Sequence, residues 1–141
     1  MQAIAPEIVS IADACLGGLR GRSALLVGPE EQRYSYMKSL NVMRMKYIYE
    51  EDTPARIPYI LPHVQLLISA PSPYGLVDAP LLSAARIAKG CDGRHTPLLI
   101  FDLAPYPHAS VEELAGLLPA VCLYTPDDLR RIVAKEMAKA S

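Results

Sequence analysis

The sequence predicts an α/β fold built on an open, mainly parallel sheet of five strands. Five short apolar runs alternate along the chain with segments of helical periodicity or with loops, which is typical of parallel sheets with intervening helices. These runs are almost continuously apolar, as in strands that are buried on both faces. With 141 residues, of which 51% are hydrophobic and 21% charged, the chain is long enough to bury a core.

We expect a single domain over residues 1–141, with an N-terminal helix and turn in 1–21, an α/β core in 22–124 and a C-terminal helix in 125–141. Apolar side chains at helical spacing predict the first helix, and they are Ile4, Ile8, Ile11, Cys15 and Leu19. Three glycines then end this helix. Residues 23–27, "SALLV", form the first expected strand, and residues 30–40 form a helix with carboxylates in its first turn.

Residues 45–50, "MKYIYE", predict the second strand, because aromatic and β-branched residues favour strands. Prolines at 54, 58 and 62 exclude a long helix from residues 51–63. The remaining expected elements are strands in 64–69, 97–104 and 120–125 and helices in 79–88 and 110–118.

The last segment predicts the clearest helix of the chain. Thr125 is placed to cap it, Pro126 suits the first helical position, and Asp128 follows the cap by three residues.

Charge and hydropathy exclude several classes of partner. The net charge is −1, from 14 basic and 15 acidic residues, so nothing favours nucleic acid. The apolar runs are too short to cross a membrane, and the first residues lack the pattern of a signal peptide. We therefore expect a cytoplasmic protein. No C-x-x-C pair is present among the three cysteines, and the histidines have no metal-ligand spacing, so we expect no metal.

In an open parallel sheet, ligands bind beyond the carboxyl ends of the strands. This places Gly28, Glu50 and the loops that begin at Ser69 and Asp102 along one rim, where we expect the functional site.

Four stretches resemble the NADPH-binding domain of glutamyl-tRNA reductase, the enzyme that opens tetrapyrrole synthesis in many organisms. They are "IADACLGGLRGRSALLVG", "LLISAPSPYG", "GRHTPLLIFDLAPYPHASVEE" and "VCLYTPDDLRRIV", and the last two are the most specific. The resemblance implies a three-layer Rossmann-like domain, as a stand-alone and degenerate version. It also implies a cofactor-binding set, namely Gly28, Pro29, Glu31, Glu50, Ser69, Ala70, Asp102 and Leu103.

The chain departs from this family where a dinucleotide should bind. The family loop reads like G-A-G-E-M-G, whereas this chain has Gly28-Pro-Glu-Glu-Gln-Arg33. Glu30 replaces the glycine that lets the backbone approach a pyrophosphate, and Pro29 removes an N–H donor. Carboxylates at 50, 51 and 52 should repel the 2′-phosphate of NADPH. Residues 51–63 are also too few for the usual elements, so we expect one edge strand of the sheet to be lost.

Two functions follow from these observations. The first is an accessory protein that has no catalytic residues and catalyses no reaction by itself. It would bind a protein partner or a second copy through the exposed sheet edge or the rim loops. The resemblance would link it to tetrapyrrole (haem) synthesis. Seven tyrosines, at 34, 36, 47, 49, 59, 74 and 106, suit such an interface. The alternative is a functional NAD(H)- or NADP(H)-binding domain, or a subunit of a split oxidoreductase, that uses Glu50 on a ribose. An independent oxidoreductase would need catalytic residues that the sequence does not show.

The cysteines and Asp102 have simpler interpretations. Cys91 lies near Arg94 and His95, which could activate its thiol, but an ordinary surface cysteine is favoured. Cys15 and Cys122 are interpreted as packing residues, and Asp102 as a structural cap of its strand.

Overall fold

In a computed structural model, residues 4–70, 82–104 and 109–140 are described. Their strands form one five-stranded sheet in the order β2-β1-β3-β4-β5, and all neighbouring pairs are parallel. The strands are β1 (Ser23–Val27), β2 (Tyr47–Glu51), β3 (Leu66–Ser69), β4 (Leu98–Asp102) and β5 (Val121–Tyr124). The predicted α/β class and five-stranded parallel sheet are confirmed.

The strand order also confirms the expected loss of an edge strand. The common dinucleotide-binding sheet has the order 3-2-1-4-5-6, and the order found here is that sequence without its first member. As a result β2 pairs only with β1, and it is an edge of the sheet within the described residues.

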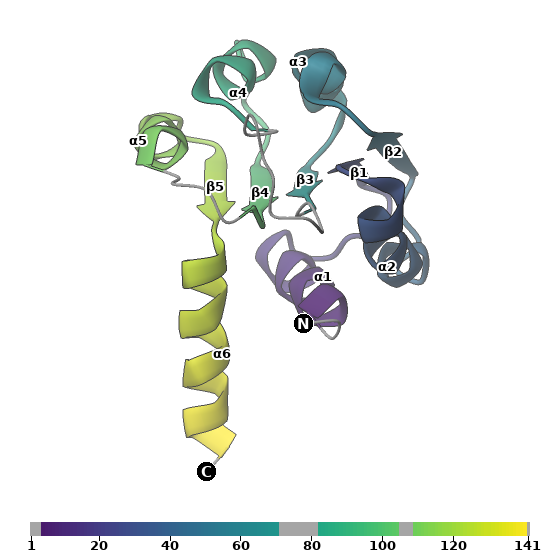
Figure 1. The fold of residues 1–141 in the computed structure, drawn as a ribbon, viewed down its shortest axis with the longest axis vertical. Helices are drawn as coiled ribbons and strands as arrows, with labels where there is room; N and C mark the ends of the chain where they lie inside the picture. The colour runs from purple at the N-terminus through teal and green to yellow at the C-terminus, as the bar shows by residue number, and fades with distance from the viewer. Residues whose placement is uncertain (1–3, 71–81, 105–108, 141) are drawn as a thin grey trace.

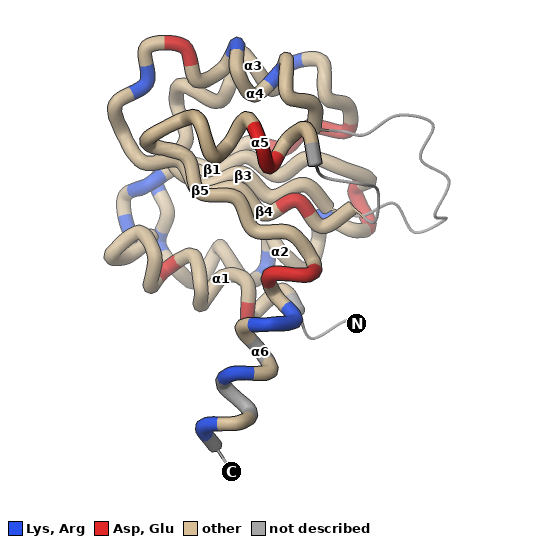
Figure 2. The backbone as a smooth tube through the Cα atoms, turned by 90° about the vertical axis from the view of Figure 1, so that its left-hand side faces the viewer, with Lys and Arg blue, Asp and Glu red and all other residues tan. Residues whose placement is uncertain are grey.

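Helices cover both faces of the sheet and give three layers (Figure 1). One face is covered by α1 (Ile4–Cys15) and α2 (Glu30–Asn41), and the other by α3 (Ile57–Ile60), α4 (Ala84–Gly90) and α5 (Ala109–Leu117). The last helix, α6 (Pro126–Ala140), follows β5 and projects away from the other elements. Figure 2 shows basic positions recurring along its length.

Alternation along the strands divides the buried side chains into two cores. Leu26, Ile68 and Phe101 belong to the core beneath α1 and α2. Leu25, Leu67 and Ile100 belong to the core beneath the three other helices. Successive residues of a strand point to opposite faces, so each apolar run supplies both cores at once.

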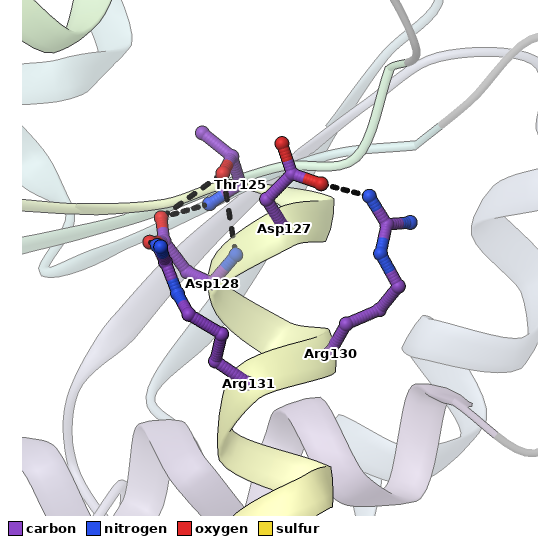
Figure 3. A network of polar contacts seen from close by, with 5 residues as sticks. All are labelled: Thr125, Asp127, Asp128, Arg130 and Arg131. Carbon is purple, nitrogen blue, oxygen red and sulfur yellow. Dashed lines mark hydrogen bonds and ion pairs between the residues drawn. The ribbon is translucent and has the colours of Figure 1, made fainter.

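The N-terminus of α6 has the cap that the sequence predicts. The Asp128 carboxylate accepts hydrogen bonds from the Thr125 N–H at 2.8 Å and from the Thr125 hydroxyl at 3.0 Å. Arg131 also pairs with Asp128, and Arg130 pairs with Asp127 one turn away (Figure 3). Burial alone would raise the pKa of Asp128, but the bonds from Thr125 and Arg131 outweigh it and lower that pKa.

Prolines divide residues 51–63 into short pieces, as expected. A 3₁₀ turn (Pro54–Arg56), the single turn of α3 and a second 3₁₀ turn (Leu61–His63) follow one another. Arg94 holds the end of this segment, since its guanidinium donates to the carbonyls of Leu61 and Val64.

The helix expected in residues 79–88 starts later in the structure than the sequence predicts. Residues 79–81 lie outside the described residues, and α4 begins only at Ala84, because the Ser83 hydroxyl accepts a hydrogen bond from the Arg86 N–H and caps it there. The strand β2 begins two residues later than expected, at Tyr47, and ends one residue later, at Glu51. No helix among the described residues is long and apolar enough to cross a membrane.

Candidate functional site

Four predicted site residues meet at the carboxyl ends of adjacent strands. Val27 is in register with Glu51 on one side and with Ser69 on the other. Ser69 is in turn in register with Asp102 on β4. Gly28, Glu50, Ser69 and Asp102 therefore lie along one rim, at the point where the order of the strands reverses between β1 and β3.

Gly28 makes the tight exit from β1. Its φ is +133°, and a Cβ added there would lie 3.1 Å from both the Cβ and the carbonyl oxygen of Ala70. Its N–H donates to the Glu51 carbonyl at 3.0 Å, while the Ala70 N–H donates to the Val27 carbonyl at 2.8 Å. The loop has thus kept the first glycine of a dinucleotide site, because any side chain there would be strained and crowded.

The loop is closed by Arg33, a residue that the sequence analysis did not single out. Arg33 lies on the first turns of α2 and is only 6% exposed. Its Nε donates to the Gly28 carbonyl at 2.8 Å, and its two terminal nitrogens donate to Glu50 at 2.8 Å and to Asp52 at 2.5 Å. We call these four residues, Gly28, Arg33, Glu50 and Asp52, the Arg33 network.

The Arg33 network occupies the groups that a dinucleotide would need. Arg33 stands where the third glycine of the motif lets helix and strand approach, and Glu50 stands where a ribose-binding acid is expected. Here the Glu50 carboxylate is committed to the guanidinium. Two features of the sequence could have identified this contact, namely the arginine five residues after Gly28 and the three acids at 50–52.

The N-terminus of α2 also opposes an anion. Pro29 is the N-cap residue of α2 and forms no side-chain hydrogen bond with the helix, and Glu30 and Glu31 lie in the first turn. Two carboxylates complement the positive end of the helix dipole, and they leave it unfavourable to a phosphate. Glu31, predicted to contact a cofactor, is exposed.

The rim has a second part on the opposite face of the sheet. Ser69 is fully buried, and its hydroxyl has no hydrogen-bond partner among the described residues. Asp102 is also fully buried and accepts from the Ala104 N–H at 3.4 Å. The Leu103 N–H donates to the Ser69 carbonyl at 3.1 Å. Most of the two loops expected to complete this part, after Ala70 and after Ala104, lies outside the described residues.

The predictions for the cysteines are reversed. Cys91 is buried, not on the surface, and this burial raises the pKa of its thiol more than Arg94 lowers it. Cys15 and Cys122 are exposed, not packed. The Cys15 thiol lies 3.6 Å from the Tyr124 hydroxyl, and this contact, with burial and Cys122, raises the pKa of Tyr124. The burial and the raised pKa of Cys91 do not support an activated thiol at this position.

The tyrosines that were expected at an interface are divided. Tyr34, Tyr47 and Tyr59 are well exposed, whereas Tyr36 is buried and its pKa is raised to about 12 by that burial. Tyr74 and Tyr106 lie outside the described residues. Within the described part of the chain, no group of three His, Cys, Asp or Glu side chains comes together as metal ligands do.

Comparisons with known proteins confirm the resemblance stated from the sequence motifs. A glutamyl-tRNA reductase of Methanospirillum hungatei is 26% identical over 155 residues, which cover 92% of this chain and 35% of that protein. Another, of Alkalilimnicola ehrlichii, is 31% identical over 152 residues, covering 94% of this chain and 32% of that protein. The chain therefore spans about a third of the length of these relatives.

No protein-family model matches the chain. A crystal structure of the TT0316 protein from Thermus thermophilus covers 89% of this chain and 47% of its own, with 18% identity and a TM-score of 0.49. The fold assignment rests on the strand order and pairing of the chain itself.

Proposed function

We propose that this chain is a reductase-like Rossmann domain that no longer binds a nucleotide. It acts as an accessory protein by binding a protein partner. The single observation that carries this proposal is the Arg33 network. A buried guanidinium holds the loop carbonyl and both nearby carboxylates at hydrogen-bonding distance. The domain thereby satisfies with its own side chain the groups that a dinucleotide would otherwise contact.

Charge supports the same conclusion. A pyrophosphate at this loop would meet Glu30 at the position of the second glycine and the first-turn carboxylate of Glu31. A bulky arginine replaces the third glycine. Each change opposes the close backbone approach and the positive field that phosphate binding needs.

The link to tetrapyrrole synthesis rests on the two relatives, both glutamyl-tRNA reductases. The chain corresponds to about a third of each, so their reaction is not assigned to it. Cys91, which lies near Arg94, is buried with a raised pKa and does not have the character of a nucleophile.

A fluorescence titration with NADH and NADPH tests this proposal. The unmodified protein should show no saturable binding up to millimolar nucleotide. The double variant Glu30→Gly, Arg33→Gly should gain measurable binding of NADH, because it restores both glycines and frees Glu50. The control is Arg56→Gly, which removes an exposed arginine paired with Glu51 at 3.2 Å outside the loop. Micromolar binding by the unmodified protein would overturn the proposal.

The second candidate is a domain that still binds NAD(H) or NADP(H), alone or within a split oxidoreductase. One observation favours it, namely the buried Ser69 hydroxyl without a described partner at the rim, because buried polar groups are normally satisfied. If nucleotide fills this need, the unmodified protein will bind NADH, and Ser69→Ala will weaken that binding.

A further inference from the structure

Two exposed cysteines from distant parts of the chain lie beside the same tyrosine hydroxyl. Cys15 is the last residue of α1, Cys122 is the second residue of β5, and both are exposed. The Cys15 sulfur lies 3.6 Å from the Tyr124 hydroxyl oxygen. The hydrogen bond with Cys15 is the main cause that raises the pKa of Tyr124, and a weaker one with Cys122 contributes. We call these three side chains the Cys15–Cys122 site.

The register of β5 explains why the two thiols meet. Cys122 is in register with Leu99 of β4, and Tyr124 is in register with Phe101. Both of these β4 residues belong to the core beneath α1 and α2, so Cys122 and Tyr124 point to that same face of the sheet. Cys15 reaches the site from the end of α1, which packs on this face.

Neighbouring contacts hold the site in place. The Tyr124 ring stacks on Phe101 with centroids 5.2 Å apart, which fixes the direction of its hydroxyl. Arg22 donates to two carbonyls of the turn that follows Cys15, at 2.7 and 2.8 Å. Rotation about the Cα–Cβ bond moves a cysteine sulfur by about 3 Å. This movement is on the scale of the gap between two sulfurs that flank one oxygen, so a disulfide bond is within their reach.

We propose that Cys15 and Cys122 are a redox-active thiol pair that closes into an internal disulfide when a low-molecular-weight disulfide oxidises the protein. One thiolate of the pair first attacks a sulfur of the oxidant and forms a mixed disulfide, and the other half of the oxidant leaves as a thiolate. The second thiolate then attacks the cysteine sulfur of the mixed disulfide and releases the remaining half. The pair loses two electrons and two protons, and the oxidant becomes two thiols.

The surroundings of the three cysteines support this assignment. Both members of the pair are exposed, so an oxidant can reach them. The raised pKa of Tyr124 means that its hydroxyl keeps its proton at neutral pH and can donate to a sulfur that carries negative charge during the exchange. Cys91 is buried, and burial raises the pKa of its thiol, so it stays outside the reaction.

Oxidation of the reduced full chain with glutathione disulfide, followed by mass spectrometry and peptide mapping, is the first test. The product should be a single chain that has lost the mass of two hydrogen atoms, with Cys15 joined to Cys122 and Cys91 free. Cys15→Ser and Cys122→Ser should each stop at a mixed disulfide with one glutathione. The control Cys91→Ala should close as the unmodified chain does.

Three results of this experiment would overturn the proposal. They are a chain that keeps one glutathione on each exposed cysteine, a disulfide that forms only between two chains, and a pair that stays reduced while the oxidant is in excess. Each would show that the two sulfurs do not meet in the folded protein.

Urea unfolding of the oxidised and reduced forms tests whether the bond suits the folded chain. A bond between Cys15 and Cys122 closes most of the chain into one loop, and long loops give large stabilisation. The oxidised form should therefore unfold at a urea concentration about 1 M higher, and dithiothreitol should restore the original midpoint. Cys15→Ser, treated in the same way, should show no such shift. An equal or lower midpoint after oxidation would contradict the proposal, because the bond would then strain the fold.

This inference goes beyond the proposed function and does not depend on it. The Cys15–Cys122 site joins α1 to β5, whereas the Arg33 network joins α2 to β2. A protein that binds no nucleotide and forms no internal disulfide would end this inference and leave the proposed function standing. A protein that forms the disulfide and binds NADH tightly would support the thiol pair and reject the proposed function.

Discussion

Replacing Arg33 with alanine is the most informative change to this domain, because one side chain joins the loop, the edge strand and the helix. The guanidinium makes three hydrogen bonds from a nearly buried position. Its removal leaves the Gly28 carbonyl without that donor. It also leaves the carboxylates of Glu50 and Asp52 without their cation.

The cost can be worked out from exposure. The side chains of Glu50 and Asp52 are 41% and 73% exposed, so solvent screens both ion pairs and each contributes only about 0.5–1 kcal/mol. The buried Gly28 carbonyl adds about 1 kcal/mol when it loses its donor. We expect Arg33→Ala to lower the free energy of unfolding by about 2.5 kcal/mol and the melting temperature by about 10 °C, given the scale for a chain of this length.

Urea and thermal unfolding followed by circular dichroism measure this effect. Arg56→Ala is the matched control, because Arg56 is 72% exposed in its pair with Glu51 and should change the free energy by no more than about 0.5 kcal/mol. Adding Glu50→Gln and Asp52→Asn to Arg33→Ala should recover about 1 kcal/mol, since the carboxylates then no longer repel each other. Equal unfolding midpoints for Arg33→Ala and the unmodified protein would refute the reasoning.

Three further predictions concern other parts of the fold. Gly90→Ala should cost about 1–3 kcal/mol in urea unfolding, because its Cβ would lie 2.6 Å from Leu61 Cδ1; an unchanged midpoint would show that Leu61 moves aside freely. Asp128→Asn should lower stability by about 1 kcal/mol at pH 7 through loss of the cap at Thr125. Because the folded-state pKa of Asp128 is lowered, this difference should persist above the unfolded pKa and vanish as the pH falls through the folded one; a constant difference in acid would contradict it. Cys91 should react with a thiol reagent at neutral pH only after unfolding, whereas the two exposed cysteines react in the native state, as peptide mapping of the labelled protein will show.

Local patterns predicted the fold well where one physical rule decided the outcome. The apolar run from Ser23 to Val27 matches β1 at both ends, because a fully buried strand has no other arrangement that hides its side chains. Thr125 and Asp128 indicated the start of α6, since a cap is satisfied within four residues. The short segment after β2 likewise indicated the missing edge strand.

Local sequence patterns did not predict the contacts between elements that are distant in the sequence. The Arg33 network joins residues 17 and 19 positions apart, and it depends on how α2 lies against β2. Cys91 is buried because the loop that carries it packs into the core with Ile57 and Leu82, which a polar local sequence does not reveal. Cys15 and Cys122 lie on α1 and β5, where helical or strand periodicity cannot tell an exposed position from a buried one.

The salt bridge between Glu50 and Arg33 keeps the loop closed in most molecules of the protein. If opening the Arg33 network costs about 2.5 kcal/mol, only about 1–2% of molecules have the loop free at any time. A ligand that needs the open form then has a dissociation constant about seventyfold above its intrinsic value. An intrinsic Kd of about 1 μM would be measured as about 70 μM. Arg33 thus limits binding at this loop to a ligand whose intrinsic affinity exceeds the cost of opening the network.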